Sequence, residues 1–169
     1  MIAVGINPLF AENRQGPGLG KPISPDEIAK WDISVFPDGE GLPKGEGTVT
    51  EGEKIYEQQC LACHGQGGLG ATADQLAGAQ MSLTSEYPEQ TIGTYWPYAT
   101  TVFDVIRRSM PMTQPGSLTN DQTYAVTAYL LFLNELIAKD DIMNATTLPK
   151  VIMPNEDGFI DVYKEEKSE

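Results

Sequence analysis

The chain has 169 residues, of which 40% are hydrophobic and 21% charged, as is typical of a soluble, globular chain with one ordinary domain. Its formal net charge of −13 argues against nucleic-acid binding, because contact with phosphates needs a basic surface. No apolar run approaches the roughly 20 residues that a membrane-spanning helix needs, so we expect no membrane span in the mature chain.

Residues 1–11, MIAVGINPLFA, resemble the last part of an apolar signal segment that closes at Ala11. They lack the basic region that starts such a signal, so this interpretation implies a start that is too short or a signal that is partly removed. An ordinary N-terminal segment is the alternative. A retained membrane anchor is disfavoured because Gly5, Asn7 and Pro8 interrupt the apolar stretch.

Residues 12–45 form a predicted N-terminal arm, in which turns rich in glycine and proline surround one short helix. Ser24 is expected to cap this helix, with Pro25 as its first residue and Glu27 completing a capping box. The helix is expected to run towards Trp31.

Residues 46–138 are predicted to hold the regular core, and the first helix of this region begins near Thr50. Thr50 and Glu53 have the T-x-x-E spacing of a capping box. Gly52 and Tyr56 lie four residues apart and therefore on one face of this helix. A glycine on that face allows a second helix to approach closely, and Tyr56 is expected to fill the space beside it.

The run CLACH contains Cys60, Cys63 and His64, which are the only cysteines and the only histidine in the chain. C-x-x-C-H is the attachment signature of c-type haem, in which two thiols one helical turn apart add to two vinyl groups and the histidine ligates the iron. A thioredoxin-like pair needs a βαβ context that is not visible here. A structural zinc site needs four N or S ligands, and the cysteines and the histidine supply three. We therefore predict one covalently attached haem c, and with it a compartment outside the cytoplasm, where thioether formation takes place.

Residues 65–93 are rich in small residues and are predicted to form loops. The segment 94–112 is predicted to be a helix, with Pro97 in an early position and an end before Pro111. A further helix begins at Thr119, which starts a T-x-x-Q capping box, and its broadly apolar sequence predicts burial.

Three side chains of the segment 94–112 are candidates for contact with the haem. Trp96 is expected to contact the ring, with ordinary aromatic core as the alternative. Arg107 and Arg108, with Lys54, are the only basic side chains in the region 46–138. We expect at least one arginine, Arg108 before Arg107, to pair with a haem propionate, because an unpaired buried carboxylate is costly. A plain surface salt bridge is the alternative.

The iron needs a sixth ligand, and in the absence of a second histidine a methionine is the natural candidate. Met110 is the predicted ligand, because it follows a predicted helix end and directly precedes Pro111, which holds it extended. Met112 is the rival. With both axial positions filled by protein, no open position remains for a substrate, which favours electron transfer over catalysis.

Residues 139–169 form a predicted extended C-terminal tail. Pro149 and Pro154 favour an extended course over a surface, and the charged end, YKEEKSE, is expected to be disordered.

CxxCH, a mid-chain Met-Pro and a C-terminal YLLFL helix resemble the class I cytochrome c domain, an all-α fold that here carries extended N- and C-terminal arms. Longer segments are similar to the cytochrome subunits of periplasmic sulfane and sulfite dehydrogenases of sulfur-oxidising bacteria. These segments are GLGKPISPDEIAKWDI, GTYWPYATTVFDVIRRSMP, PGSLTNDQTYAVTAYLLFLN and TLPKVIMPNEDGF. The resemblance implies that Cys60 and Cys63 attach haem and that His64 and Met110 ligate its iron.

The same resemblance implies a non-catalytic, periplasmic subunit that accepts electrons from a molybdenum-cofactor dehydrogenase subunit and passes them to another cytochrome or an oxidase. Many sulfane-dehydrogenase cytochrome subunits have a second haem domain, whereas this chain has one CxxCH, which leaves the exact partner open. A free soluble shuttle that feeds a terminal oxidase is an alternative. A haem enzyme or gas sensor with an open axial site is another, and binding of carbon monoxide to the reduced protein would favour it.

Overall fold

The computed structural model describes residues 19–160 and 162. The described residues fall into two units, which divide between Ile33 and Ser34. The predicted signal remnant lies outside the described residues, as does most of the charged end of the tail. Within 19–160, none of the helices has the length and apolar character that crossing a bilayer requires.

The N-terminal unit contains helix α1 (Pro25–Trp31), which confirms the short helix predicted for the arm. The Ser24 hydroxyl accepts a hydrogen bond from the Glu27 N–H at 3.2 Å, and Pro25 occupies the first turn. The Glu27 carboxylate accepts a hydrogen bond from Lys30 at 3.1 Å. None of the residues of α1 is buried.

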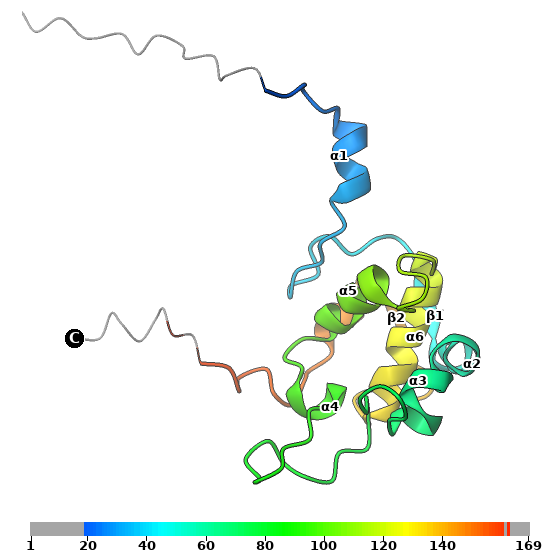
Figure 1. The fold of residues 1–169 in the computed structure, drawn as a ribbon, viewed down its shortest axis with the longest axis vertical. Helices are drawn as coiled ribbons and strands as arrows, with labels where there is room; N and C mark the ends of the chain where they lie inside the picture. The colour runs from blue at the N-terminus through cyan, green and yellow to red at the C-terminus, as the bar shows by residue number, and fades with distance from the viewer. Residues whose placement is uncertain (1–18, 161, 163–169) are drawn as a thin grey trace, which may run out of the picture. The chain divides into compact units, whose positions relative to one another are not determined.

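The second unit is mainly helical, which confirms the predicted all-α class (Figure 1). Its elements are β1 (Glu46–Thr48), α2 (Val49–Gln59), α3 (Leu61–His64), η1 (Gln66–Gly68), α4 (Ile92–Tyr95), α5 (Ala99–Ser109), α6 (Asn120–Leu133), β2 (Ile142–Asn144) and η2 (Leu148–Lys150). Helix α6 packs against both α2 and α5 and lies between them (Figure 1). The two short strands pair antiparallel, with Gly47 opposite Met143. This pairing connects the segment before α2 with the segment after α6.

Helix α2 begins earlier than the sequence predicted, because Thr48 and not Thr50 is its N-cap. The Thr48 hydroxyl accepts from the Glu51 N–H at 3.2 Å, and the Glu51 carboxylate accepts from the Thr48 N–H at 3.1 Å. The T-x-x-E spacing occurs twice here, and the Thr50–Glu53 pair lies inside the helix. The pairing of β1 with β2 keeps the chain extended only as far as Thr48, so the first of the two pairs caps the helix.

The helix predicted for 94–112 is divided into α4 and α5. Trp96 is extended (φ −72°, ψ 127°), because the residue before a proline avoids the helical region. Pro97 therefore ends a helix rather than starting one, and Tyr98 is the N-cap of α5. Helix α5 ends at Ser109, before Pro111 as predicted, and Met110 is extended (φ −117°, ψ 145°).

The predicted close approach of a second helix at Gly52 is confirmed. A Cβ on Gly52 would overlap the backbone carbonyl of Ala125 on α6 and lie 2.8 Å from the Cβ of Tyr129. The ring of Tyr56 packs against that of Tyr129, with a centroid distance of 5.3 Å. The glycine thus brings α2 and α6 together, and the two aromatic rings fill the space beside their crossing.

Residues 34–45 of the predicted N-terminal arm pack against the helices of the second unit. The Val35 N–H donates to the carboxylate of Asp104 on α5 at 3.0 Å. The buried Tyr124 hydroxyl on α6 donates to the carbonyl of Pro43 at 2.9 Å. These bonds tie this part of the arm to α5 and α6.

The described part of the C-terminal tail also packs on its own unit. Leu148 and Met153 are buried in the core, at 0% and 2% exposure. The Asn155 side chain donates to the carbonyl of Tyr95 at 2.7 Å, and the ring of Phe159 meets that of Tyr95 edge-on at 5.5 Å. The prediction of an extended course around both prolines is wrong, because Pro149 lies in the 3-10 helix η2 and Pro154 in a turn, and buried side chains anchor the tail.

Candidate haem-binding site

The CLACH run forms a single helical turn directly after α2. Cys60 is both the C-cap of α2 and the N-cap of α3, and the His64 N–H donates to its carbonyl at 2.9 Å. Cys60 is half-buried and Cys63 is exposed. The spacings of three and four residues place both thiols and the imidazole on adjoining turns of one short helix, as attachment of a porphyrin along one edge requires.

The chemistry of the thiols argues against a redox pair or a zinc site. Burial, with a smaller contribution from Cys63, raises the pKa of the Cys60 thiol to about 11. Reactive cysteines of redox pairs have a lowered pKa instead. Among the described residues, no group of three or more His, Cys, Asp or Glu side chains is arranged to hold a metal ion. Covalent attachment of haem needs no such cluster.

The ring of His64 is held in one tautomer. Its Nδ1 lies 3.1 Å from the backbone carbonyl oxygen of Asp74, and a carbonyl can only accept a hydrogen bond. Nδ1 therefore carries the proton, which leaves the lone pair of Nε2 for iron. The residues present fit a haem, because the histidine beside the two thiols offers the nitrogen that an axial ligand must offer.

Tyr56 supports the backbone beside His64, a role that the sequence did not predict. Its hydroxyl donates to the carbonyl of Gly65 at 2.9 Å, and the Gly70 N–H donates to the carbonyl of His64 at 2.8 Å. Burial, followed by a contribution from Cys60, raises the pKa of Tyr56 to about 12, so the phenol stays a donor at neutral pH. Hydrogen bonds to the backbone carbonyls of His64 and Gly65 therefore accompany the bond to the ring.

The two candidate methionine ligands differ in their surroundings. Met110 is half-buried and packs against the hydrophobic core, and its N–H donates to the carbonyl of Ile106 at 3.0 Å. Met112 is 72% exposed. A sulfur that ligates iron inside a pocket needs the first kind of place, so the structure favours Met110 as the ligand, which stays a prediction.

Trp96 lies between α4 and α5 and is half-buried against the core. This place suits both interpretations that the sequence allowed, a haem contact and ordinary aromatic core. Its contact with the haem ring stays a prediction.

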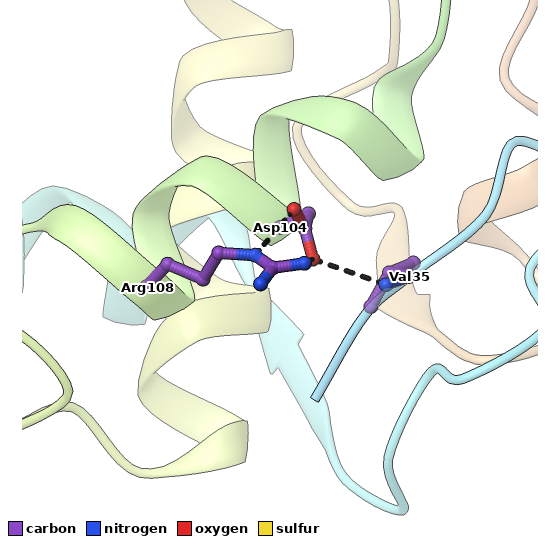
Figure 2. A network of polar contacts seen from close by, with 3 residues as sticks. All are labelled: Val35, Asp104 and Arg108. Atoms are coloured by element: carbon purple, nitrogen blue, oxygen red, sulfur yellow. Dashed lines mark hydrogen bonds and ion pairs between the residues drawn. The ribbon is translucent and has the colours of Figure 1, made fainter. Parts of the chain in front are cut away.

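Arg108 forms a bidentate ion pair with Asp104, one turn earlier on α5 (Figure 2). Its Nε lies 2.7 Å from one carboxylate oxygen and its Nη2 lies 3.0 Å from the other, which also accepts from the Val35 N–H. This is the salt bridge that we gave as the alternative to a propionate partner. Arg107 is half-buried on the same helix. Propionate pairing stays a prediction for both arginines, and Asp104 already occupies two donors of Arg108.

The cytochrome c family model matches residues 49–134, from the first residue of α2 to the end of α6. The match covers half of the chain and includes the CLACH turn, and the chain belongs to the cytochrome c family. It is thus an electron-transfer protein that binds haem c covalently.

The chain is similar to a chain in the crystal structure of the sulfane dehydrogenase SoxCD from Paracoccus pantotrophus. The two are 40% identical, the match covers 90% of this chain and 75% of that one, and the TM-score is 0.83. The match therefore extends well beyond the haem-binding region, into the arms. A thiosulfate dehydrogenase of Stutzerimonas stutzeri (strain A1501) is 30% identical over 90 residues, which are 52% of this chain and 28% of the relative. The chain thus spans little more than a quarter of that relative's length.

Proposed function

We propose that this cytochrome is a periplasmic subunit that accepts single electrons from a molybdenum-cofactor dehydrogenase oxidising sulfite or protein-bound sulfane sulfur. The observation that carries the proposal is the likeness to the sulfane dehydrogenase structure, at 40% identity over 90% of this chain. A haem domain alone would explain a match confined to residues 49–134. The longer match includes segments that surround the haem domain and that a general cytochrome c does not need.

In this proposal, Cys60 and Cys63 form the thioether bonds, and His64 Nε2 and the Met110 sulfur ligate the iron. The bound haem supplies one-electron exchange between Fe(III) and Fe(II). The carbonyl of Asp74 keeps the His64 ring oriented, and the Tyr56 hydroxyl holds the next peptide group. With His64 and Met110 both holding the iron, substrate would have no place to bind there, and the site would serve electron transfer rather than catalysis.

Charge supports a protein as the electron donor or acceptor. The net charge of −13 steers the chain towards basic patches on other proteins, and such attraction raises association rates at low salt. Reduction of the haem by its donor is therefore expected to slow as ionic strength rises.

A free soluble shuttle that delivers electrons to a terminal oxidase is the second candidate. It is favoured by the packing of residues 34–45 and 139–160 on their own unit, because these parts of the arms already have an intramolecular role. Such packing weakens the argument that the whole length of both arms exists for a partner.

The test is gentle purification of the native protein from the periplasmic fraction, with mass spectrometry of what co-elutes and addition of sulfite. A molybdenum subunit in constant ratio to the haem protein, and a haem that sulfite reduces, are the expected results. A haem protein that elutes alone from the periplasm and that sulfite does not reduce would contradict the proposed donor and favour the shuttle. Absence from the periplasmic fraction would contradict the proposed location.

A further inference from the structure

Helix α1 carries an apolar face that is uncovered. Ile28 and Trp31 lie three residues apart on one side of the helix, and Ile23 directly precedes the N-cap. Ile23 and Ile28 hold the N′ and N4 positions of the helix, the two positions that pack together in a hydrophobic staple. The exposed fractions are 54% for Ile23, 47% for Ile28 and 77% for Trp31.

The other side of α1 is charged. Asp26, Glu27 and Lys30 occupy it, and Lys30 lies 3.1 Å from the Glu27 carboxylate. The helix is therefore amphipathic, with isoleucine and tryptophan on one side and a solvated ion pair on the other. Helices with this pattern bury their apolar side against another structural element.

A helix of 7 residues does not persist in water on its propensity alone, because nucleation is costly and few hydrogen bonds repay it. The Ser24 cap and the proline of the first turn favour the helix but bury no apolar surface. The face formed by Ile23, Ile28 and Trp31 is exposed, so the helix lacks the stability that burial of this face would add.

The other described parts of the arms have bonds or buried side chains within their own unit, although Ile152, Phe159 and Ile160 of the tail are exposed. Residues 34–45 bond to α5 and α6, and the tail places Leu148 and Met153 in the core. The segment around α1 thus differs from the rest of the arms, because none of the residues of α1 is buried. Its apolar side chains lie on a regular helix and are therefore available to another protein.

We propose that α1 is a docking helix, and that its Ile23–Ile28–Trp31 face inserts into an apolar groove of the dehydrogenase subunit. The inference rests on the proposed function and identifies α1 as the segment that stabilises the complex. Helices that present anchors three and four residues apart bind grooves in this way, and tryptophan is prominent among the residues that dominate such interfaces.

The net charge of the chain favours a different protein over a second copy of the chain as the occupant of this face. Two copies would each bring a net charge of −13, and the resulting repulsion opposes self-association. A different protein with basic residues around its groove would instead be attracted by the net negative charge of this chain. The partner that fits is therefore an unlike subunit with an apolar groove and a basic margin.

The experiment uses the full-length haem protein and the separately purified dehydrogenase subunit. Trp31→Ala is compared with the wild type and with a matched control, Ile152→Ser, which removes an 80% exposed apolar side chain from the second unit. Binding is measured by titration, together with the reduction potential, the unfolding temperature and the sedimentation of the isolated cytochromes. We expect Trp31→Ala to weaken binding by about tenfold or more, as loss of an interface anchor does. We expect Ile152→Ser to bind as the wild type does, and the isolated proteins to be otherwise alike.

Four outcomes would overturn the inference. Equal binding of Trp31→Ala and the wild type would show that α1 does not dock, and would leave the proposed function standing. A lower unfolding temperature of isolated Trp31→Ala would show that the helix covers its own chain. A dimeric wild type that Trp31→Ala turns into a monomer would identify a second copy as the occupant. If the wild type itself does not bind the dehydrogenase subunit, the proposed function fails, and the docking helix has no such partner.

Discussion

Two buried tyrosines offer a matched test of the support beside the haem ligand. Tyr56 is 1% exposed and donates to the Gly65 carbonyl at 2.9 Å, and Tyr124 is 0% exposed and donates to the Pro43 carbonyl at 2.9 Å. Burial raises the pKa of each to about 12. The two bonds are alike in kind and differ in place, because only the first lies next to His64.

Substitution of either tyrosine by phenylalanine removes one oxygen and keeps the ring. A buried hydrogen bond of this kind contributes about 1 kcal/mol net, so each variant is expected to lose about 1 kcal/mol of unfolding free energy. The Gly68 N–H also reaches the Gly65 carbonyl, at 3.3 Å, which keeps the cost of Tyr56→Phe from rising further. For a chain of this size, the loss corresponds to a fall of about 2–4 °C in the unfolding temperature.

Only Tyr56→Phe is expected to change the haem. Loss of the phenol leaves the negative end of the Gly65 carbonyl less compensated beside the iron ligand, which favours Fe(III) and lowers the reduction potential. The assay is a spectroelectrochemical titration of the three holoproteins, paired with urea unfolding. If both variants lose similar stability and keep the wild-type potential, Tyr56 acts only as a packing residue and the reasoning is refuted.

The same tyrosines predict how stability depends on alkaline pH. Because their pKa is raised from 10.0 to about 12 in the folded protein, the folded state holds these protons more tightly than the unfolded state. Their contribution to stability is complete below pH 10 and is lost as the pH rises towards 12. Each phenylalanine variant lacks one such group, so its unfolding free energy should fall less steeply between these values. Parallel curves for the variants and the wild type would contradict this.

Three further predictions concern other parts of the cytochrome. Met110→Ala should open an axial position and let the reduced protein bind carbon monoxide, whereas Met112→Ala should not; the opposite result, read from absorption spectra, would identify the rival ligand. Gly52→Ala should cost about 1–3 kcal/mol or more in urea unfolding, because its Cβ overlaps the backbone of α6, and an unchanged midpoint would contradict the close packing. Asp104→Asn should cost less than about 1 kcal/mol, since the pair with Arg108 is partly exposed and is screened by salt, and a large loss at high salt would contradict this.

Local spacing was enough to predict the features that depend on neighbours in the chain. The caps at Ser24 and Thr119 lie where predicted, because each is a contact over three residues. The end of α5 before Pro111 follows from the restriction that proline places on its neighbours. The same rule applied to Trp96 would have predicted the break before Pro97, which our reading of the proline as a helix start overlooked.

The ion pair of Arg108 also had a local signal. Asp104 precedes it by four residues on one helix face, a spacing that favours pairing. What the sequence did not show is that the same carboxylate accepts the Val35 N–H, a contact across 69 positions of the chain (Figure 2).

The chemistry of this protein follows from local sequence, because CLACH holds every cysteine and histidine of the chain within five consecutive residues. Contacts between distant segments fix the start of α2 and the orientation of the His64 ring. The start of α2 depends on pairing between β1 and β2, and the His64 tautomer depends on the carbonyl of Asp74, a loop residue ten positions on. Such contacts also anchor residues 34–45 and the tail within their own unit, whereas no residue of α1 is buried. Contacts between distant segments arise only when the whole chain packs, so residue spacing does not reveal them.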